Sequence, residues 1–228
     1  MKILPAIDIL DGKVVRLFQG DYEKATFYSH NPLQIATTFA KQGYASLHVI
    51  DLAGARSGTL QAMKEIEAIL STGLEIQVGG GIRTCERVRD LLTMGVRRVI
   101  IGTQALVDPS FVDALIQNFP KDALVVSIDI RNGKIATHGW LEEHSHSLDD
   151  TIRRLEKQGI RQIIITDITR DGTLQGANFS LYRPLVRAFR NLEFYAAGGL
   201  RGQFDIEQLR QIGVAGVIIG RSFYEHLL

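Results

Sequence analysis

The segment GGIRTCERVRDLLTMGVRRVIIGT at residues 80–103 has a counterpart, GGLRGQFDIEQLRQIGVAGVIIGR, at residues 198–221. Aligned without gaps, the two share ten identities in 24 positions, where average composition would give about one or two by chance. Each segment begins with two glycines, continues with helical apolar spacing and ends in an apolar run. The chain therefore carries an internal repeat of a helix followed by a strand.

The repeat extends beyond these segments. IDILDGKVV at residues 7–15 matches IDIRNGKIA at 128–136, and VIDLAGARSGT at 49–59 resembles ITDITRDGT at 165–173. The sequence therefore predicts two homologous halves, in which every chemical group occurs as a pair.

Apolar, β-branched runs alternate with helical patterns along the whole chain. The predicted strands are 3–7, 47–50, 75–78, 98–101, 124–128, 162–165, 193–197 and 216–219. The predicted helices are 32–43, 60–73, 85–95, 109–119, 148–159, 179–189 and 203–213. No Pro/Ser-rich linker interrupts this alternation, which is typical of a (β/α)8 barrel.

We therefore expect an α/β fold, a (β/α)8 TIM barrel forming a single domain over residues 1–228, with (β/α)4 half-barrels of approximately 1–120 and 121–228. Alternation alone leaves a doubly wound sheet open. Its usual glycine fingerprint after the first strand is replaced here by IDILDG at residues 7–12.

Composition limits the possible partners. A chain of 228 residues that is 45% hydrophobic is long enough to bury a large core, and a net charge of +1 argues against nucleic-acid binding. No basic leader or apolar run of 18 residues appears, so we expect no membrane association and a cytoplasmic monomer. The single Cys85 excludes an internal disulfide and a multi-cysteine metal site.

Paired glycine turns follow the predicted strands of both halves. Glycines let a ligand approach the backbone, and a following helix start offers free N–H groups, which together suit a phosphate. The expected cradles are Gly80, Gly81, Gly102 and Thr103 in the first half and Gly198, Gly199, Gly220 and Arg221 in the second. The alternative is that these glycines only permit tight turns. Their symmetric recurrence favours a ligand with a phosphate at each end.

Asp8 and Asp129 are equivalent acids at the ends of the first and fifth predicted strands. Two carboxylates across a barrel mouth suit opposite proton-transfer roles if their environments separate their pKa values. The alternative is that each acid caps a loop or pairs with a cation, for example Lys13 or Lys134.

A metal site is not expected, because His48 and Asp51 lie too far around the barrel from the two acids. By default His48 is a core or surface histidine. We expect His138, His144 and His146 to face solvent.

Several longer motifs together resemble the bacterial phosphoribosylformimino-aminoimidazole carboxamide ribotide (ProFAR) isomerase family of histidine biosynthesis. They are LPAIDILDGKVVRLFQGD, HVIDLAG, QVGGGIR, TDITRDGTLQGAN, AAGGLR and GVIIGRSFYE, with Gly139-Trp140 after the fifth strand. The sister family, the cyclase subunit of imidazole glycerol phosphate synthase, shares the repeat and both acids. Pro5, Arg16, Gln19 and Trp140 favour the isomerase.

This resemblance implies a bisphosphorylated ribotide substrate and an Amadori rearrangement of an aminoaldose to an aminoketose, without metal or organic cofactor. It implies that Asp8 is the general base and Asp129 the general acid. Thr166 resembles a hydroxyl that assists the intermediate, and Asp171 either binds substrate or transfers protons. Trp140 would stack on the imidazole end. Further expected substrate-binding residues are Arg16, Gly20, His48, Arg83, Gly172 and Thr173.

The predicted loops 17–32, 130–147 and 169–178 are long, and we expect them to close over substrate. The chain ends at Leu228, soon after the second cradle, so we expect a short last helix and exposed apolar surface beside it. Three alternatives stay open: an isomerase that also accepts phosphoribosyl anthranilate, the cyclase, and a catalytically silent phosphate-binding barrel.

Overall fold

A computed structural model describes residues 1–137, 142–143 and 147–225. Eight parallel strands form its centre, in the order β10-β11-β12-β1-β4-β5-β6-β7, and β10 pairs with β7 to close the barrel. The strands are β1 (Lys2–Leu10), β4 (Ser46–Asp51), β5 (Glu75–Gly79), β6 (Arg98–Ile101), β7 (Leu124–Arg131), β10 (Gln162–Asp167), β11 (Glu193–Ala197) and β12 (Gly216–Ile219). The predicted (β/α)8 barrel and all eight of its strands are confirmed.

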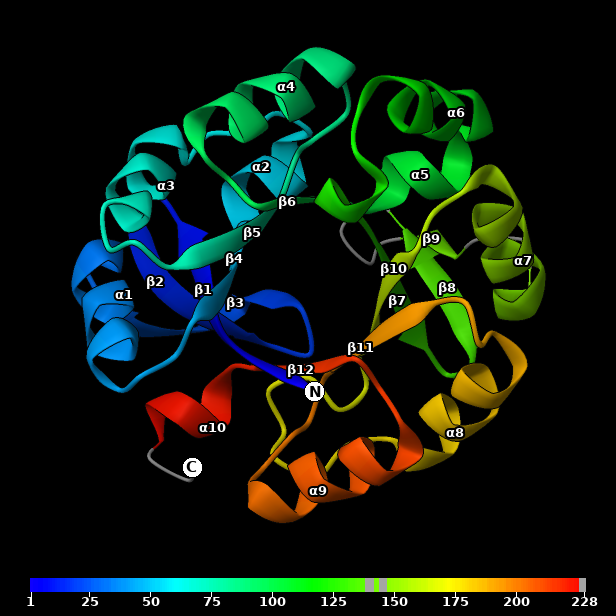
Figure 1. Cartoon of the computed structure of the whole chain (residues 1–228). Helices are drawn as coiled ribbons and strands as arrows, with labels where there is room; N and C mark the ends of the chain where they lie inside the picture. Colours follow the sequence, from blue (N-terminus) through cyan, green and yellow to red (C-terminus); the bar gives the residue numbers. More distant parts are fainter. Residues whose placement is uncertain (138–141, 144–146, 226–228) are drawn as a thin grey trace.

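Helices surround the barrel, as the view along its axis shows (Figure 1). The longer ones match the predicted helices: α1 (Pro32–Lys41), α3 (Met63–Leu70), α4 (Cys85–Met94), α6 (Pro109–Asn118), α7 (Leu148–Gln158), α8 (Phe179–Ala188) and α9 (Gln203–Ile212). Shorter elements are α2 (Leu52–Ser57), α5 (Thr103–Val107), α10 (Arg221–Tyr224) and a 3-10 turn, η1 (Lys121–Ala123). None of the described helices is long and apolar enough to cross a membrane.

Local sequence sets where several of these helices begin and end. Thr84 and Ser147 lie just before α4 and α7, and each side-chain oxygen accepts a hydrogen bond from a backbone N–H of the first turn. Gly95 and Gly159 end the same two helices in the left-handed conformation, which glycine adopts without a steric penalty.

The core has two larger parts, one between the sheet and the helices and one inside the barrel, and a small third cluster lies at the first hairpin. Leu4, Ile100 and Ile164 help to fill the interior. Polar side chains are buried there too, among them Gln77 and Arg98, and these matter for the site described below.

Two antiparallel hairpins extend the barrel, and they correct the predicted loops. Strands β2 (Lys13–Phe18) and β3 (Asp21–Ser29) occupy most of the predicted loop 17–32, and β8 (Lys134–Thr137) and β9 (Glu142–Glu143) lie within 130–147. Strand β1 continues past Asp8, which lies opposite Val15 of β2. Strand β7 likewise continues past Asp129, which lies opposite Ala136 of β8. The acids are therefore within strands, where each strand passes from the barrel into its hairpin.

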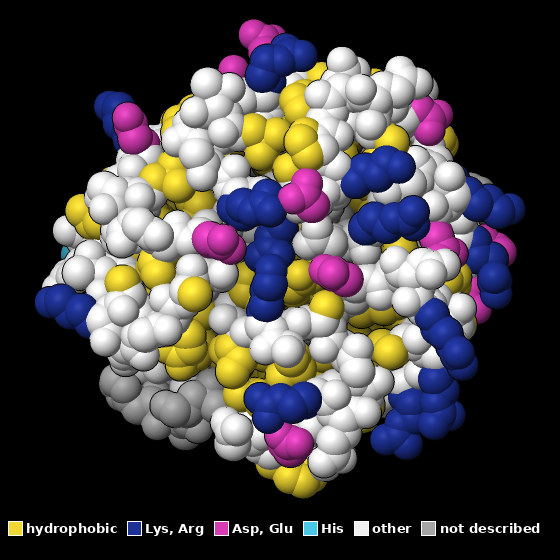
Figure 2. Space-filling model, in the orientation of Figure 1, with side chains coloured by type: hydrophobic (Ala, Val, Ile, Leu, Met, Phe, Trp, Pro, Cys, Tyr) yellow, Lys and Arg dark blue, Asp and Glu magenta, His cyan; other side chains and the backbone are white. Residues whose placement is uncertain are grey.

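The face at which the chain begins carries mixed charge. Figure 2, in the orientation of Figure 1, shows Lys and Arg side chains near the middle of this face with Asp and Glu side chains beside them. One such pair joins Arg97 Nη2 to Asp122 Oδ2 at 2.8 Å. The charges of the two signs are interspersed on this face.

Candidate active site

An open cavity of about 220 Å³ lies at the end of the barrel where the strands finish. Its lining draws on both halves of the chain. The predicted site residues that line it are Asp8, Arg16, Gly20, His48, Gly80, Gly81, Arg83, Gly102, Thr103, Asp129, Thr166 and Asp171.

Arg16 connects two of the predicted acids. Its Nη1 donates to Asp8 Oδ2 at 2.8 Å, and its Nη2 lies 3.8 Å from Asp171 Oδ1. Asp8 and Arg16 are both 9% exposed. The ion-pair alternative for Asp8 thus holds with a different cation, since Lys13 lies opposite Leu10 and is exposed.

The same arrangement sets the acidity of the group. Burial raises the pKa of Asp8 to about 6, even though the Arg16 charge acts in the opposite direction and Asp171 adds to the rise. Burial also raises the pKa of Asp171, against the pull of Arg16. A carboxyl with a pKa near 6 is mostly ionised at neutral pH and accepts a proton more readily than an ordinary aspartate.

Asp129 and Thr166 lie on neighbouring strands on the other side of the cavity. They are register partners in β7 and β10, so both point into the barrel mouth at one level. The hydroxyl of Ser127, two residues before Asp129, donates to Asp129 Oδ1 at 3.4 Å. Asp8 and Asp129 thus face one cavity from opposite halves of the chain.

The first glycine cradle combines a packing role with an opening to the cavity. Gly80 and Gly81 have φ of +110° and +68°, and a side chain at Gly80 would collide with the backbone carbonyl of Asp51. At Gly102, by contrast, a Cβ would meet nothing within 4 Å. The tight-turn explanation therefore applies to the Gly-Gly pair, whereas Gly102 leaves room at the start of α5.

The second cradle lines a smaller cavity of about 30 Å³. Its residues include Gly172, Gly198, Gly199, Gly220 and Arg221. Arg16 and Asp171 line it too, and together with Asp8 they form what we call the acid cluster. The Arg16 guanidinium occupies the space that a side chain at Gly220 would need. The second cradle is therefore in direct contact with Arg16, the ion-pair partner of Asp8.

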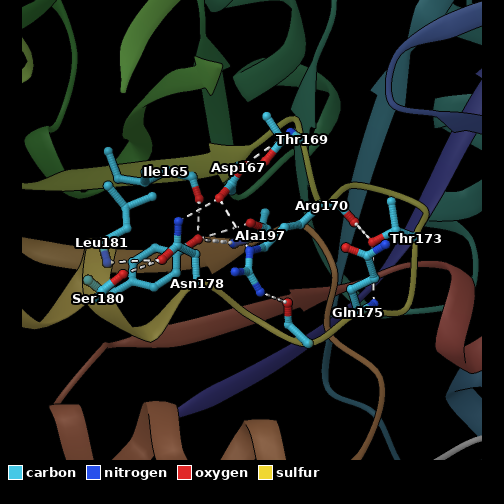
Figure 3. Close-up of polar contacts among 12 residues, drawn as sticks. Ile165, Asp167, Thr169, Arg170, Thr173, Gln175, Asn178, Ser180, Leu181 and Ala197 are labelled. Carbon is cyan, nitrogen blue, oxygen red and sulfur yellow. Dashed lines mark hydrogen bonds and ion pairs between the residues drawn. The ribbon is translucent and has the colours of Figure 1, made fainter. Parts of the chain in front are cut away.

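The segment between β10 and α8 is held by side chains at its base (Figure 3). Asp167 accepts hydrogen bonds from Thr169 Oγ1 at 2.6 Å and from Asn178 Nδ2 at 2.7 Å. The Thr173 hydroxyl donates to the Arg170 carbonyl at 2.6 Å. Thr173 lines neither cavity and instead closes the turn that carries Asp171.

This segment also contacts the first hairpin. The backbone N–H of Gln19 donates to the Asp171 carbonyl at 3.1 Å, and Gln19 Nε2 donates to the Thr169 carbonyl at 2.7 Å. Arg221 Nη1 donates to the Gly172 carbonyl at 2.7 Å. The predicted lid segments from the two halves thus touch each other beside the acid cluster.

The remaining predicted residues have different positions. His48 is buried at the cavity floor, and Arg83 is exposed at its edge with its guanidinium against Gly58. Trp140 and the histidines at 138, 144 and 146 lie outside the described residues. Among the described residues, no three His, Cys, Asp or Glu side chains gather as a metal site.

The sequence did not predict several residues that line the cavity, among them the polar residues Tyr22, Gln104 and Ser127. The Tyr22 hydroxyl donates to the Leu52 carbonyl at 3.1 Å, which connects the hairpin to the start of α2. Ser127 could have been predicted from the sequence. It lies two residues before Asp129, and because the side chains of a strand alternate between its two faces, both residues share one face.

Fold and site together define a (β/α)8 barrel with paired acids between two glycine cradles at the carboxyl ends of its strands. The chain belongs to the family described as histidine biosynthesis protein, whose pattern it matches over residues 2–228. Similar proteins from Streptococcus sanguinis (41% identical, 98% of this chain and 93% of the relative) and Gloeothece citriformis (43%, 98% and 88%) have the same name. Each is called 1-(5-phosphoribosyl)-5-((5-phosphoribosylamino)methylideneamino)imidazole-4-carboxamide isomerase.

Proposed function

We propose that this chain is the isomerase its relatives are named for, converting the aminoaldose ProFAR to the corresponding aminoketose in histidine biosynthesis. The observation that carries the proposal is the placement of Asp8 and Asp129 in one cavity between the two glycine cradles. An elongated substrate with a phosphoribosyl group at each end could place one phosphate in each cradle and its reacting sugar between the two acids.

Each cradle binds one phosphate. Gly102 and the start of α5 supply backbone N–H groups on one side, and Gly220 with the start of α10 supplies them on the other. Arg83 and Arg221 add charge at the two ends. The two anion sites then hold the reacting sugar between the acids.

The rearrangement proceeds by proton transfers between the substrate and the two acids. Asp129, as its acid form, gives a proton to the furanose ring oxygen while the bond from that oxygen to C1 breaks, which leaves a protonated Schiff base. Asp8 then removes the proton from C2, and that electron pair forms the C1=C2 bond of the enolamine while the C1=N electrons return to nitrogen. Protonated Asp8 returns a proton to C1 and the C2 hydroxyl gives its proton to the Asp129 carboxylate, which forms the C2 ketone and restores both acids. The raised pKa of Asp8, about 6, suits a base that works near neutral pH.

Three neighbours support these steps. The charge of Arg16 lowers the pKa of Asp8 against the effect of burial and so favours the ionised carboxylate. Thr166, beside Asp129, offers a hydroxyl to the intermediate. Asp171 contacts Arg16 from the loop and either orders substrate or shares the proton transfer.

The test is turnover of the aminoaldose by the purified chain, beside Asp8→Asn and Asp129→Asn, without added ammonia. We expect rapid conversion by the parent and a loss of at least about a thousandfold in kcat for each variant. Asp21→Asn, at a half-exposed acid of the first hairpin, is the matched control and should retain activity.

The outcomes separate the candidate functions. Tight substrate binding without conversion would favour a silent barrel, and ammonia-dependent turnover with a glutaminase partner would favour the cyclase. A parallel assay with phosphoribosyl anthranilate tests the broader isomerase, which uses the same acids.

Further expectations remain part of this proposal. Trp140 stacks on the imidazole end of the substrate, and the two halves arose from a common half-barrel, as the ten identities between 80–103 and 198–221 support. The chain acts as a cytoplasmic monomer, and light scattering of the purified protein tests its mass. Side chains of the protein donate and accept every proton in the proposed rearrangement, so we expect no cofactor. We also expect that nucleic acid is not a partner.

A further inference from the structure

His48 lies on the cavity floor, one layer below Asp8. In the pairing of β1 with β4, Ala6 is opposite His48 and Asp8 is opposite Ile50. His48 lines the cavity although it is only 8% exposed. The ring nitrogen that faces the cavity is the one within reach of a bound molecule.

One ring nitrogen is already engaged from behind. His48 Nδ1 lies 2.8 Å from Nε2 of Gln77, its register partner on β5, and Gln77 is fully buried. Within the described residues, no hydrogen-bond partner is found for His48 Nε2. This atom is also not among the solvent-inaccessible side-chain atoms that lack a partner, so it is accessible. Nε2 is therefore the nitrogen open to the cavity.

The orientation of the Gln77 amide follows from its other neighbour. Arg98 is the register partner of Gln77 on β6, so Gln77 lies between His48 and the strand that carries a permanent cation, although Gln77 Oε1 makes no hydrogen bond within the described residues (Figure 1 shows β4, β5 and β6 side by side). An amide dipole next to a guanidinium is most stable with its oxygen toward the charge and its NH2 away from it. The Gln77 NH2 therefore donates to His48 Nδ1.

The protonation state of His48 completes the assignment. Burial, with the charges of Arg16 and Arg98, lowers its pKa to about 3, so the imidazole is neutral at pH 7. A neutral imidazole whose Nδ1 accepts a hydrogen bond carries its hydrogen on Nε2.

We propose that Gln77 is a positioning residue that fixes His48 in the Nε2–H tautomer, so that His48 donates a hydrogen bond to a sugar oxygen of the bound substrate. This rests on the proposed function for the identity of the acceptor, and on the geometry alone for the tautomer. A neutral donor orients the sugar oxygen below Asp8 without placing another positive charge next to the base.

The tautomer is measured directly by NMR of the intact chain with 15N-labelled histidine at pH 7.5. The chain has six histidines, and the His48 signals are assigned as those missing from a His48→Gln sample. We expect a pyridine-type signal for Nδ1 and a pyrrole-type signal for Nε2. The reverse assignment in the parent would overturn the proposal.

Two substitutions test the role of Gln77. Gln77→Glu replaces the NH2 donor with an acceptor, so the Nδ1–H tautomer or an imidazolium should appear, with a raised His48 pKa. Gln77→Met removes the partner, and a mixture of tautomers is expected. We expect kcat/KM for the aminoaldose to fall roughly tenfold in Gln77→Met, and further in Gln77→Glu.

Gln162→Met is the matched control. Gln162 is another buried glutamine of the barrel interior, but it contacts Arg98 and the Asp122 carbonyl rather than His48. This variant should lose stability while the His48 signals stay as in the parent. Unchanged signals and kinetics in both Gln77 variants would overturn the positioning role. If the parent shows the expected tautomer but does not convert the aminoaldose, the proposed function is overturned while the tautomer assignment remains supported.

Discussion

Arg16 Nη1 and Asp8 Oδ2 are 2.8 Å apart on the adjacent strands β2 and β1, and both side chains are almost completely buried. The pair combines two opposing effects, because burial raises the pKa of the carboxyl while the guanidinium lowers it. The balance leaves the pKa of Asp8 at about 6.

The pH dependence of the parent follows from this value. A general base must be ionised, so kcat/KM should have an acidic limb that falls tenfold per pH unit well below pH 6, while the need for protonated Asp129 sets a separate limb at higher pH. Initial rates from pH 4.5 to 8.5 measure it. A profile without an acidic limb between pH 5 and 7 would contradict the role of Asp8 as base.

Arg16→Met should move that limb to higher pH. Removing the cation leaves burial and Asp171 acting alone, and both raise the pKa of Asp8. Arg16→Lys retains a charge and is the control, with a smaller displacement expected. The comparison uses the same rate profile, and an unmoved limb in Arg16→Met would argue against the ion pair in solution.

Gly80→Ala and Gly102→Ala should separate folding from binding. Gly80 has a φ of +110° and backbone against it, so alanine there should cost at least about 2 kcal/mol of unfolding free energy. Gly102 has open space toward the cavity, so alanine there should raise KM with little change in stability. Urea denaturation and steady-state kinetics of both variants provide the two measurements.

Tyr182→Phe should destabilise the fold by about 1–3 kcal/mol. The fully buried Tyr182 hydroxyl accepts from Ala197 N–H and lies 2.9 Å from both the Ile165 and Ala197 carbonyls, so its loss leaves strand ends unpaired beside the second cradle. Tyr44→Phe is the control, because in the described part of the chain its hydroxyl has no partner. Equal midpoints in urea would contradict this prediction.

His48 should make stability depend on pH. Its pKa is near 3 in the folded chain and near 6.5 when unfolded, so between these values only the unfolded state binds the proton. Stability is therefore lost as pH falls below 6.5, by about 1.4 kcal/mol per pH unit from this group. Asp8 acts oppositely between about pH 4 and 6, because its folded pKa is raised.

His48→Gln should remove the first of these contributions, which makes the variant relatively more stable than the parent at pH 5 than at pH 7.5. Urea titrations at the two pH values measure the difference. An equal difference between variant and parent at both pH values would show that His48 is not held neutral by the fold.

The barrel strands were predictable because each is a short apolar run between helical patterns, and the repeat paired them. The hairpin strand β3 was not, because Asp21–Ser29 carries mostly polar and partly exposed side chains without apolar alternation. It forms by pairing with β2 rather than by burying a face.

The site shows the same division. Asp8 and Asp129 were found because an acid follows an apolar run in equivalent places, but the partner of Asp8 was not, since hairpin register decides it. That register places Lys13 opposite Leu10 and brings Arg16 to the acid. Gln77 gave no signal, since its contact with His48 exists only after β4 and β5 pair.

The pairing of β1 with β12 has a consequence for synthesis on the ribosome. Lys2 through Pro5 lie beside Gly216 through Ile219, so the first strand made receives its second neighbour only when nearly the whole chain has emerged. Until then β1 and β11 each have an open edge that another nascent chain can join. Rapid translation of the last segment would shorten that exposure, and a pause before residue 216 would prolong it.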